Sequence, residues 1–313
     1  PPRSTLFPYT TLFRSNPRRP GRELTNSVAL LQSGRIQAVR HKTLLPTYDV
    51  FDEDRYFEPA ADNGVVAFGP HRLGLTVCED VWNDEDFWRE RRYPRNPAVE
   101  LAAAGADLMI NISASPWHLG KDRTRRRMLE SLVRKMGVPL VYCNLVGGND
   151  ELIFDGGSLA LNARGEVVGA GRRFEDDFVV IDSGETTGPV DGGMVEEEEI
   201  YRALVLGTRD YLGKCGFSTA VLGLSGGIDS AVTACLAVAA LGPEQVWGVA
   251  LPSPYSSRGS LDDARALASN LGIRYDVIPI GPPFGSVKGQ LQELFRGRRS
   301  EERRVGKECR SRW

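Results

Sequence analysis

Short apolar runs alternate with amphipathic segments along the first two thirds of the chain. Two short strands are expected within 27–45, on either side of a turn at 32–35. Further apolar runs of strand length lie at 65–68, 73–77, 108–112, 138–146 and 177–181, and helical spacing of apolar residues lies at 96–104 and 121–135. This alternation predicts a layered α/β domain.

The segment 121–135 shows the clearest helical pattern. Gly137 follows as a helix-ending residue. Its apolar positions lie on one face, at Met128, Leu129, Leu132, Val133 and Met136. The arginines of this helix, Arg123 and Arg125 to Arg127, are predicted to lie on the opposite, solvated side.

A change of composition separates a second region. Residues 183–193 are rich in Gly, Thr and Pro, which is typical of a linker. An acid-rich helix start follows at 196–199. The later strands are expected at 220–224, 246–251 and 273–280, with helices at 230–240 and from a cap at Ser260 to Gly272. This βαβαβ series predicts a parallel sheet with ligand at the carboxyl ends of its strands.

Composition excludes several classes of function. The net charge of −2 indicates no general attraction to nucleic acid or anionic membranes, and no apolar run reaches membrane-spanning length. No signal peptide is visible, and the five cysteines form no CxxC pair, which favours reduced thiols in the cytoplasm. The three histidines lack metal-ligand spacing. Segments 1–15 and 300–313 resemble translated sequencing-adapter sequence and are expected to be foreign, so the natural part is expected to be cut at both ends.

The stretch LGLSGGIDS at 222–230 carries the strongest chemical signal. A strand, a glycine turn and a helix start present free N–H groups to an anion, and two serine hydroxyls add donors. Asp229 is suited to holding a Mg²⁺ that bridges phosphates. No lysine precedes Ser230, so this is not the GxxxxGK[ST] loop. A Gly-rich turn without a ligand is the alternative interpretation.

Cys78 ends the apolar run 73–77 and is followed by two acids and a tryptophan. This position suits a nucleophile on a sharp turn. A buried structural cysteine is an equally good interpretation from spacing alone.

Four blocks in order resemble the nitrilase-type glutaminase domain of glutamine-dependent NAD synthetases: KTLLPTYDVFDEDRYFEP (42–59), LTVCEDVW (75–82), SASPWHLGK (113–121) and GGNDELIFDGGS (147–158). SGGIDS resembles the pyrophosphate loop of enzymes that split ATP into AMP and pyrophosphate, and 251–264 again resembles the synthetase. There, Ser256, Ser257 and Arg258 either face ribose or phosphate or form a plain polar loop.

The resemblance implies roles for individual residues. Cys78 would be the nucleophile and Lys42 the oxyanion stabiliser of a Glu–Lys–Cys triad. Tyr48, Ser115 and Lys121 would contact glutamine, although Tyr48 also fits a core aromatic and Lys121 a solvated helix start. The ATP site would comprise Gly223, Leu224, Ser225, Gly226, Gly227, Ile228, Asp229 and Ser230, with Mg²⁺ at Asp229. The base Glu would lie upstream, and Glu23 lacks its surroundings.

The expected fold is therefore α/β: a nitrilase-type αββα sandwich at 16–182, a linker at 183–195 and an incomplete Rossmann-like ATP-pyrophosphatase domain at 196–299. The implied reaction combines glutamine hydrolysis, adenylation of deamido-NAD by ATP, and amidation by ammonia to NAD. The family suggests a homo-oligomer, and the fragment alone is expected to be impaired. The alternatives are another ATP-pyrophosphatase amidotransferase with a carbon–nitrogen hydrolase domain, or a non-catalytic remnant.

Overall fold

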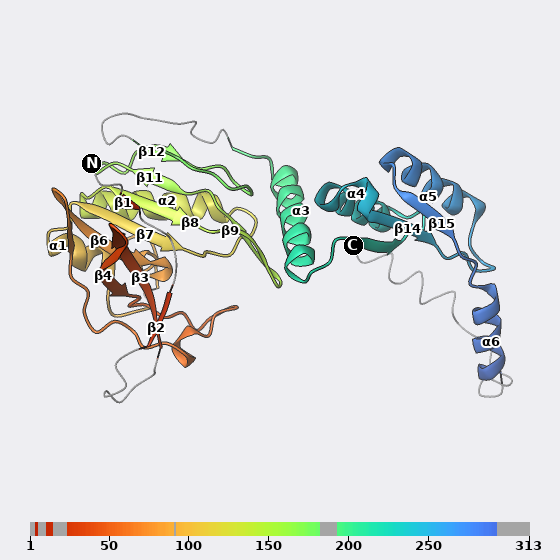
Figure 1. Ribbon diagram of the computed structural model, residues 1–313, viewed down its shortest axis with the longest axis horizontal. Coiled ribbons are helices and arrows are strands. Elements are labelled where there is room, and N and C mark those ends of the chain that lie inside the picture. Colours follow the sequence, from red (N-terminus) through yellow and green to blue (C-terminus); the bar gives the residue numbers. More distant parts are fainter. Residues whose placement is uncertain (1–3, 6–10, 15–23, 91, 182–192, 293–313) are drawn as a thin grey trace. The chain divides into compact units, whose positions relative to one another are not determined.

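A computed structural model describes residues 4–5, 11–14, 24–90, 92–181 and 193–292. Contacts divide the chain into two compact units, 1–211 and 212–313 (Figure 1). The predicted tail 300–313 lies outside the described residues, as do most of the predicted linker and much of the segment 1–15. The domain boundaries at 182 and 195 stay predictions.

A six-stranded sheet forms the centre of the first unit, in the order β12-β11-β8-β7-β6-β5. Strands β6, β7 and β8 are parallel to one another, and the outer strands β5, β11 and β12 are antiparallel to their neighbours. The bounds are β5 Val66–Phe68, β6 His71–Val77, β7 Leu108–Ser113, β8 Leu140–Asn144, β11 Leu159–Leu161 and β12 Val167–Ala170. Because β6, β7 and β8 run the same way, their carboxyl ends meet at one edge of the sheet.

A second, antiparallel sheet contains the predicted hairpin, β3 (Leu24–Gln32) and β4 (Arg35–His41). The short strands β1 (Ser4–Thr5) and β2 (Thr11–Arg14) also pair with β3. The sequence of 1–15 predicts no strand. The difference has a simple cause, since the exposed N–H and C=O groups of a strand edge accept almost any extended segment.

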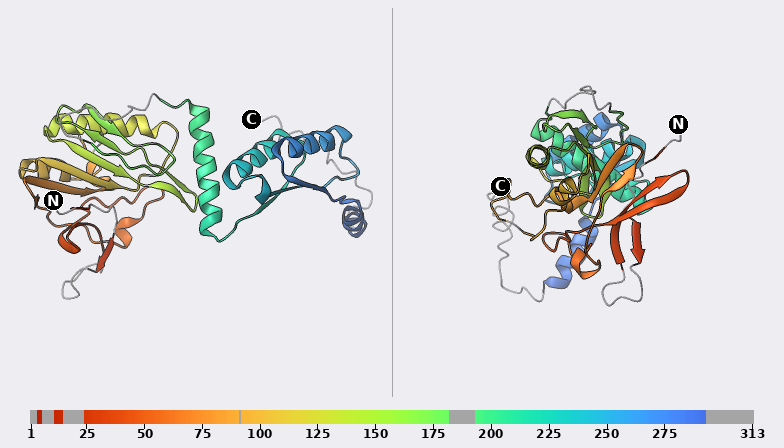
Figure 2. Two further views of the ribbon diagram at one scale, coloured as in Figure 1. Left: turned by 45° about the horizontal axis from the view of Figure 1, so that its top comes forward. Right: turned by 90° about the vertical axis from the view of Figure 1, so that its left-hand side faces the viewer.

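Three layers are stacked in the first unit, as the two views of Figure 2 show. Helices α1 (Pro97–Ala103) and α2 (Lys121–Met136) cover one face of the six-stranded sheet, and β3 and β4 cover the other. The helix-side core includes Leu101, Met109 and Leu132, and the sheet-to-sheet core includes Leu30 and Leu75. The described residues thus supply the α, β and β layers of the predicted sandwich.

Two predictions for this unit are wrong. Arg125 does not lie on a solvated face: it is 1% exposed and forms an ion pair with Asp155. Residues 177–181 form no strand, and Phe178 is 89% exposed. Asp177 instead accepts hydrogen bonds from the backbone N–H groups of Arg172 and Phe178, which holds a turn in place of a ladder.

The remaining elements that the structure describes in the first unit are one hairpin, two short 3₁₀ turns and one long helix. Strands β9 (Val146–Asn149) and β10 (Leu152–Asp155) form a hairpin, and two 3₁₀ turns, η1 (Glu53–Arg55) and η2 (Cys78–Val81), follow β4 and β6. Helix α3 (Glu196–Lys214) packs Ala203 and Leu206 against Phe174 and the hairpin.

The second unit is built on a parallel sheet, as predicted, and its strand order is β13-β14-β15. Ser257, rather than Ser260, caps α5, because the Ser257 hydroxyl accepts the Ser260 N–H at 3.1 Å. The bounds are β13 Ala220–Gly223, α4 Ile228–Leu241, η3 Pro243–Gln245, β14 Val246–Ala250, α5 Arg258–Leu271, β15 Arg274–Val277 and α6 Gly281–Leu291.

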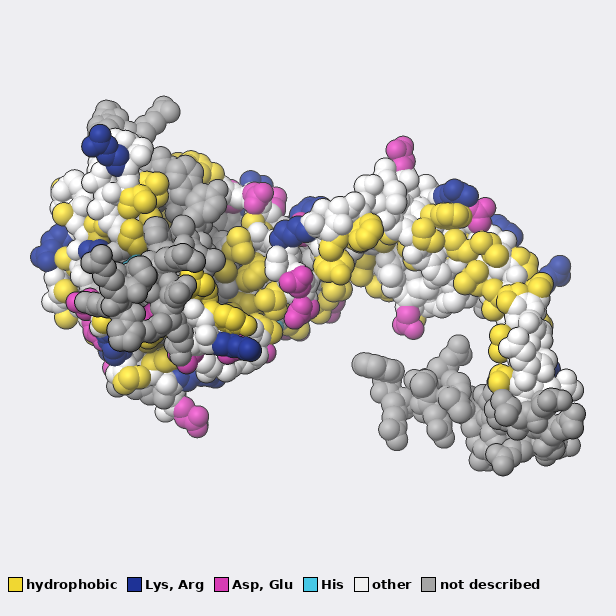
Figure 3. Space-filling view, turned by 60° about the horizontal axis from the view of Figure 1, so that its bottom comes forward, with side chains coloured by type: hydrophobic (Ala, Val, Ile, Leu, Met, Phe, Trp, Pro, Cys, Tyr) yellow, Lys and Arg dark blue, Asp and Glu magenta, His cyan; other side chains and the backbone are white. Residues whose placement is uncertain are grey.

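Large apolar side chains gather on the surface of the second unit (Figure 3). Ile228 and Tyr255 are each 75% exposed, and Val221 is 63% exposed. A surface of this kind is typical of an interface. Among the described residues, no helix is long and apolar enough to cross a membrane.

Candidate functional site

Cys78 stands where β6 turns sharply into η2. Its φ of +44° is one that residues with a side chain rarely adopt, and such strain collects at functional sites. The parallel register pairs Val77 with Ile112, and Ser113 with Asn144. The residues that follow β6, β7 and β8 therefore meet around Cys78.

The surroundings of Cys78 hold it as a neutral thiol. Burial raises the pKa of this thiol, although the Lys42 ammonium and a backbone hydrogen bond from Ala114 act to lower it. Glu79 and Glu53 add to the rise. A neutral thiol is a poor nucleophile, so attack at neutral pH requires a base to remove its proton.

Lys42 follows β4 and is only 1% exposed. Its ammonium donates hydrogen bonds to both carboxylate oxygens of Glu53, at 2.6 and 2.8 Å. Burial acts to lower the pKa of Lys42, but the Cys78 sulfur, once it is ionised, and the Glu53 carboxylate outweigh this effect, and the pKa is raised. The structure therefore brings Lys42 and Cys78 together, 36 positions apart, with the lysine fixed as a cation.

Asp80 ties the two segments to each other. Its Oδ1 accepts the backbone N–H groups of Thr43 and Leu44, both at 2.9 Å, and its Oδ2 accepts that of Val77 at 3.0 Å. One carboxylate thus fixes the chain just after Lys42 and just before Cys78. Burial raises the pKa of Asp80 to about 6, against the effect of these hydrogen bonds.

Sequence reasoning missed Glu53 and Asp80. A signal for each was present: Asp80 lies two residues after Cys78, and Glu53 lies inside the aromatic loop that carries Lys42. What the sequence did not show is which acids point inward.

Tyr48 lies beside the thiol. Its hydroxyl donates to Glu79 Oε1 at 2.8 Å, and Tyr93 donates to the same oxygen at 3.2 Å. The Arg92 guanidinium lies 3.8 Å from the centre of the Tyr48 ring. Burial and the Glu79 carboxylate raise the pKa of Tyr48, and Cys78 adds to this rise once its thiol is ionised. Tyr48 is thus a neutral hydroxyl at the site.

Ser115 and Lys121 border the same edge from the segment after β7. Ser115 is 3% exposed, and its backbone N–H donates to Asn144 Oδ1 at 3.1 Å. Lys121 Nζ donates to the Pro116 carbonyl at 2.6 Å. Burial lowers the pKa of Lys121, while Cys78, once ionised, opposes this fall. Of the residues predicted to form a glutamine site, Lys42, Tyr48 and Lys121 therefore lie within electrostatic reach of Cys78. Ser115 directly follows Ala114, whose backbone acts on the same thiol.

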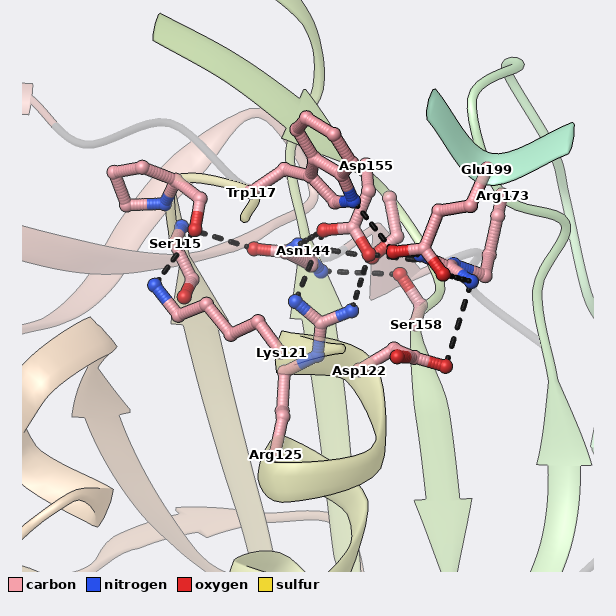
Figure 4. A network of polar contacts seen from close by, with 12 residues as sticks. Ser115, Trp117, Lys121, Asp122, Arg125, Asn144, Asp155, Ser158, Arg173 and Glu199 are labelled. Atoms are coloured by element: carbon pink, nitrogen blue, oxygen red, sulfur yellow. Dashed lines mark hydrogen bonds and ion pairs between the residues drawn. The ribbon is translucent and has the colours of Figure 1, made fainter. Parts of the chain in front are cut away.

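A buried ionic network lies beside the loop between Ser115 and Lys121 (Figure 4). Arg125 and Asp155 form a two-bond ion pair at 2.7 and 3.0 Å, both almost fully buried. Arg173 contacts Asp155 at 3.4 Å and Glu199 of α3 at 2.8 Å. The network joins α2, β10 and α3, and its members cannot be removed singly without leaving a buried charge unpaired.

The second candidate site is the SGGIDS loop of the second unit. Gly226 has a φ of +75°, and a Cβ there would collide with the Ser260 backbone. Ser225 Oγ accepts the Gly227 N–H at 3.2 Å and lies 3.1 Å from Ser230 Oγ. The hydroxyls of the loop thus fix its backbone at the N-terminus of α4.

The other loop residues differ in what they offer. Leu224 is 2% exposed and its N–H donates to Val249, so its side chain belongs to the core. Gly223 ends β13, Gly227 caps α4, and Ile228 and Asp229 lie exposed in its first turn. Among the described residues, no group of three or more His, Cys, Asp or Glu forms a metal cluster. Asp229 fits only the Mg²⁺ mode in which phosphates and water supply most ligands.

Comparisons with known proteins match a family to each of the two parts of the chain. The carbon–nitrogen hydrolase family model matches residues 11–184, and the NAD synthase family model matches 200–305. A glutamine-dependent NAD(+) synthetase of Synechocystis sp. is 47% identical over 88% of this chain and 53% of that protein. The corresponding protein of Thermotoga maritima is 39% identical over 87% of this chain and 52% of that protein.

A solved structure supports the same assignment. The glutamine-dependent NAD+ synthetase of Acinetobacter baumannii, in complex with adenosine diphosphate, has a TM-score of 0.81 and 33% identity, over 89% of this chain and 52% of that chain. The chain spans about half the length of the curated relatives it matches. The predicted fold class, a nitrilase-type unit followed by an NAD synthase unit, is confirmed. The chain therefore belongs to the carbon–nitrogen hydrolase family.

Proposed function

We propose that this sequence forms part of a glutamine-dependent NAD synthetase, in which the first unit releases ammonia from glutamine and the second binds the ATP that activates deamido-NAD. The observation that carries the proposal is the buried Lys42 ammonium acting on the Cys78 thiol at a strained strand end. The similarity to NAD(+) synthetases over both units supports the second half.

The amidase step follows from the charges at the site. A base takes the Cys78 proton as the sulfur attacks the amide carbon of glutamine, and negative charge moves to the amide oxygen. The fixed Lys42 ammonium stabilises this oxyanion. Collapse of the intermediate expels ammonia, which receives the proton, and water then hydrolyses the thioester to glutamate. The resemblance implies that this base is a glutamate, and none of the residues at the site is assigned to it.

Glutamine itself is held by the residues around Cys78. Tyr48 presents its phenol beside the thiol, fixed by Glu79. Ser115 lies next to Ala114, whose backbone donates to Cys78. Lys121 offers a half-buried cation within the field of the thiol. A cation of this kind suits the α-carboxylate of the substrate.

The synthetase step uses the loop Gly223–Ser230. The N–H groups at the start of α4 and the Ser225 and Ser230 hydroxyls would hold the phosphates of ATP, and Asp229 would bind the accompanying Mg²⁺. ATP adenylates the nicotinate carboxylate of deamido-NAD with release of pyrophosphate. Ammonia then displaces AMP to form the amide of NAD. We place the protein in the cytoplasm as a homo-oligomer, with the domain boundaries at 182 and 195.

Two measurements on a full-length protein carrying this sequence test the proposal. Glutamate release from glutamine and NAD formation from deamido-NAD are both expected, and Cys78→Ala should abolish the first while NAD formation from free ammonia persists. A glutamine-directed diazo-ketone should label Cys78. The matched control is Cys143→Ala, at a partly buried thiol in β8. Labelling at Cys143, or unchanged glutamate release by Cys78→Ala, would contradict the assignment.

A further inference from the structure

Glu199 lies on α3 and is 4% exposed, although it carries a charge. Its Oε1 accepts the Trp117 indole N–H at 2.7 Å and an Arg173 N–H at 2.8 Å, and its Oε2 accepts a second Arg173 N–H at 3.3 Å. The backbone of Gly120 also acts on this carboxylate and helps to lower its pKa. Figure 4 shows Glu199 reaching toward Arg173 and Trp117 from α3.

These contacts fix the loop 116–120 at two points. Trp117 is its second residue and Gly120 its last, and Lys121 follows at once. The loop in turn holds the Lys121 ammonium, which donates to the Pro116 carbonyl at 2.6 Å. A shift of this loop therefore moves Lys121 relative to Cys78.

The helix that carries Glu199 is itself held closely. Gly207 packs so near Gly148 that a Cβ on Gly148 would meet the Gly207 Cα at 3.0 Å. Asp210 Oδ2 accepts the Gly148 N–H at 2.8 Å. Ala203 and Leu206 are buried against the same hairpin region. This close packing makes α3 a rigid support for Glu199 rather than a flexible connection.

We propose that Glu199 is a positioning residue for the amidase site, acting through Trp117 and Gly120 on Lys121. Residue 199 lies outside the carbon–nitrogen hydrolase match of 11–184 and before the NAD synthase match at 200. The glutamine site is thus completed by a helix that lies beyond the hydrolase-family segment. The inference rests on the proposed function, because it takes Lys121 as a contact of glutamine.

The test is Glu199→Gln in a full-length protein that carries this sequence. The glutamine amide N–H₂ would face the N–H groups of Trp117 and Arg173, which are also donors, so the loop 116–120 loses part of its hydrogen bonding to α3. Since Lys121 binds substrate and does not react with it, the glutamine KM should rise about ten-fold while kcat stays within about three-fold. Hydrogen exchange at residues 116–121 should be faster.

Three further variants give the comparison. Glu198→Gln, on an exposed glutamate paired with Arg202, should leave KM unchanged. Trp117→Phe removes one hydrogen bond but keeps an aromatic ring, although a smaller one, beside Phe174, and should raise KM less than Glu199→Gln. Glu199→Asp keeps the charge and should restore part of the affinity for glutamine.

Two results would overturn the proposal. One is a KM for Glu199→Gln equal to that of Glu198→Gln. The other is a loss of kcat with unchanged KM that matches the fraction of unfolded protein, which is what a purely structural role produces. If the unsubstituted protein releases no glutamate from glutamine, or Cys78→Ala still does, then the proposed function fails instead, and the two failures are distinguishable.

Discussion

Both carboxylate oxygens of Glu53 accept hydrogen bonds from the Lys42 ammonium, at 2.6 and 2.8 Å. Lys42 is buried, and this pairing helps to keep a full positive charge near Cys78. The lysine is thus fixed in place before any substrate arrives, which is how preorganised electrostatic stabilisation works.

Replacement of Glu53 by Gln should weaken that arrangement. Loss of the carboxylate charge lowers the pKa of Lys42 and frees its ammonium, so kcat/KM for glutamine hydrolysis should fall about 10- to 100-fold. Steady-state glutamate release measures this effect. Asp52→Asn is the matched control, because Asp52 is an exposed neighbour that pairs with Arg55. Equal activity of the two variants would show that Glu53 has no part in the site.

The reactivity of Cys78 should depend on pH in a defined way. Burial raises its pKa above the ordinary value of 9.0, so iodoacetamide should modify Cys78 slowly at neutral pH. As the pH is raised toward that pKa, the rate should increase about ten-fold per pH unit, because the thiolate fraction does. Lys42→Met removes the charge that lowers this pKa, and the profile should move to higher pH. Peptide mass spectrometry separates Cys78 from the exposed Cys235, whose profile should not move. An unshifted Cys78 profile would mean that Lys42 does not act on the thiol.

Asp80 should make stability depend on pH. Its pKa is about 6 in the folded protein and 3.8 ordinarily, so the folded state binds this proton more tightly than the unfolded state. The contribution of Asp80 to the free energy of unfolding is therefore fully present below about pH 3.8 and is lost as the pH rises through about 6. Between these values the free energy of unfolding should fall with a slope approaching about 1.4 kcal/mol per pH unit.

Urea unfolding between pH 4 and pH 7 measures this slope. Asp80→Asn should be less stable at every pH, because its amide places a donor against a backbone N–H, and the slope assigned to Asp80 should vanish. A variant that retains the whole slope would assign it to other groups.

Gly226→Ala should damage the phosphate loop. The added Cβ meets the Ser260 backbone, and alanine resists a φ of +75°. We expect a loss of about 1–3 kcal/mol in the free energy of unfolding and at least about ten-fold weaker binding of ATP with Mg²⁺. Calorimetric titration measures the second effect.

The control for this loop variant is Gly213→Ala. Gly213 lies within α3 with no atom near its added Cβ, so alanine should stabilise the helix by about 0.5–1 kcal/mol and leave ATP binding unchanged. Unchanged ATP affinity in Gly226→Ala would place the nucleotide elsewhere.

Local patterns decided the elements of this protein. The helix 121–136 follows from its apolar period and from Gly137, which ends it in the left-handed conformation. The turn at Cys78 follows from an apolar strand that runs into two acids. Such features are readable because helices and strands are set by neighbours a few residues apart.

Local sequence patterns did not predict which residues pair with the buried charges. Arg125 sits in a run of arginines and was predicted to face solvent, yet it pairs with Asp155, 30 residues away. Glu199 was one of four successive glutamates at a helix start, and only it turns inward.

The sequence by itself determined the order of strands and helices, the strand-end cysteine and the glycine loop, because these depend on local spacing. Only the tertiary structure decided that Glu53 holds Lys42, that Asp80 joins the lysine and cysteine segments, and that α3 supports the loop before Lys121. The reason is physical: a buried charge is stable only beside a partner, and that partner is chosen by how separate elements pack.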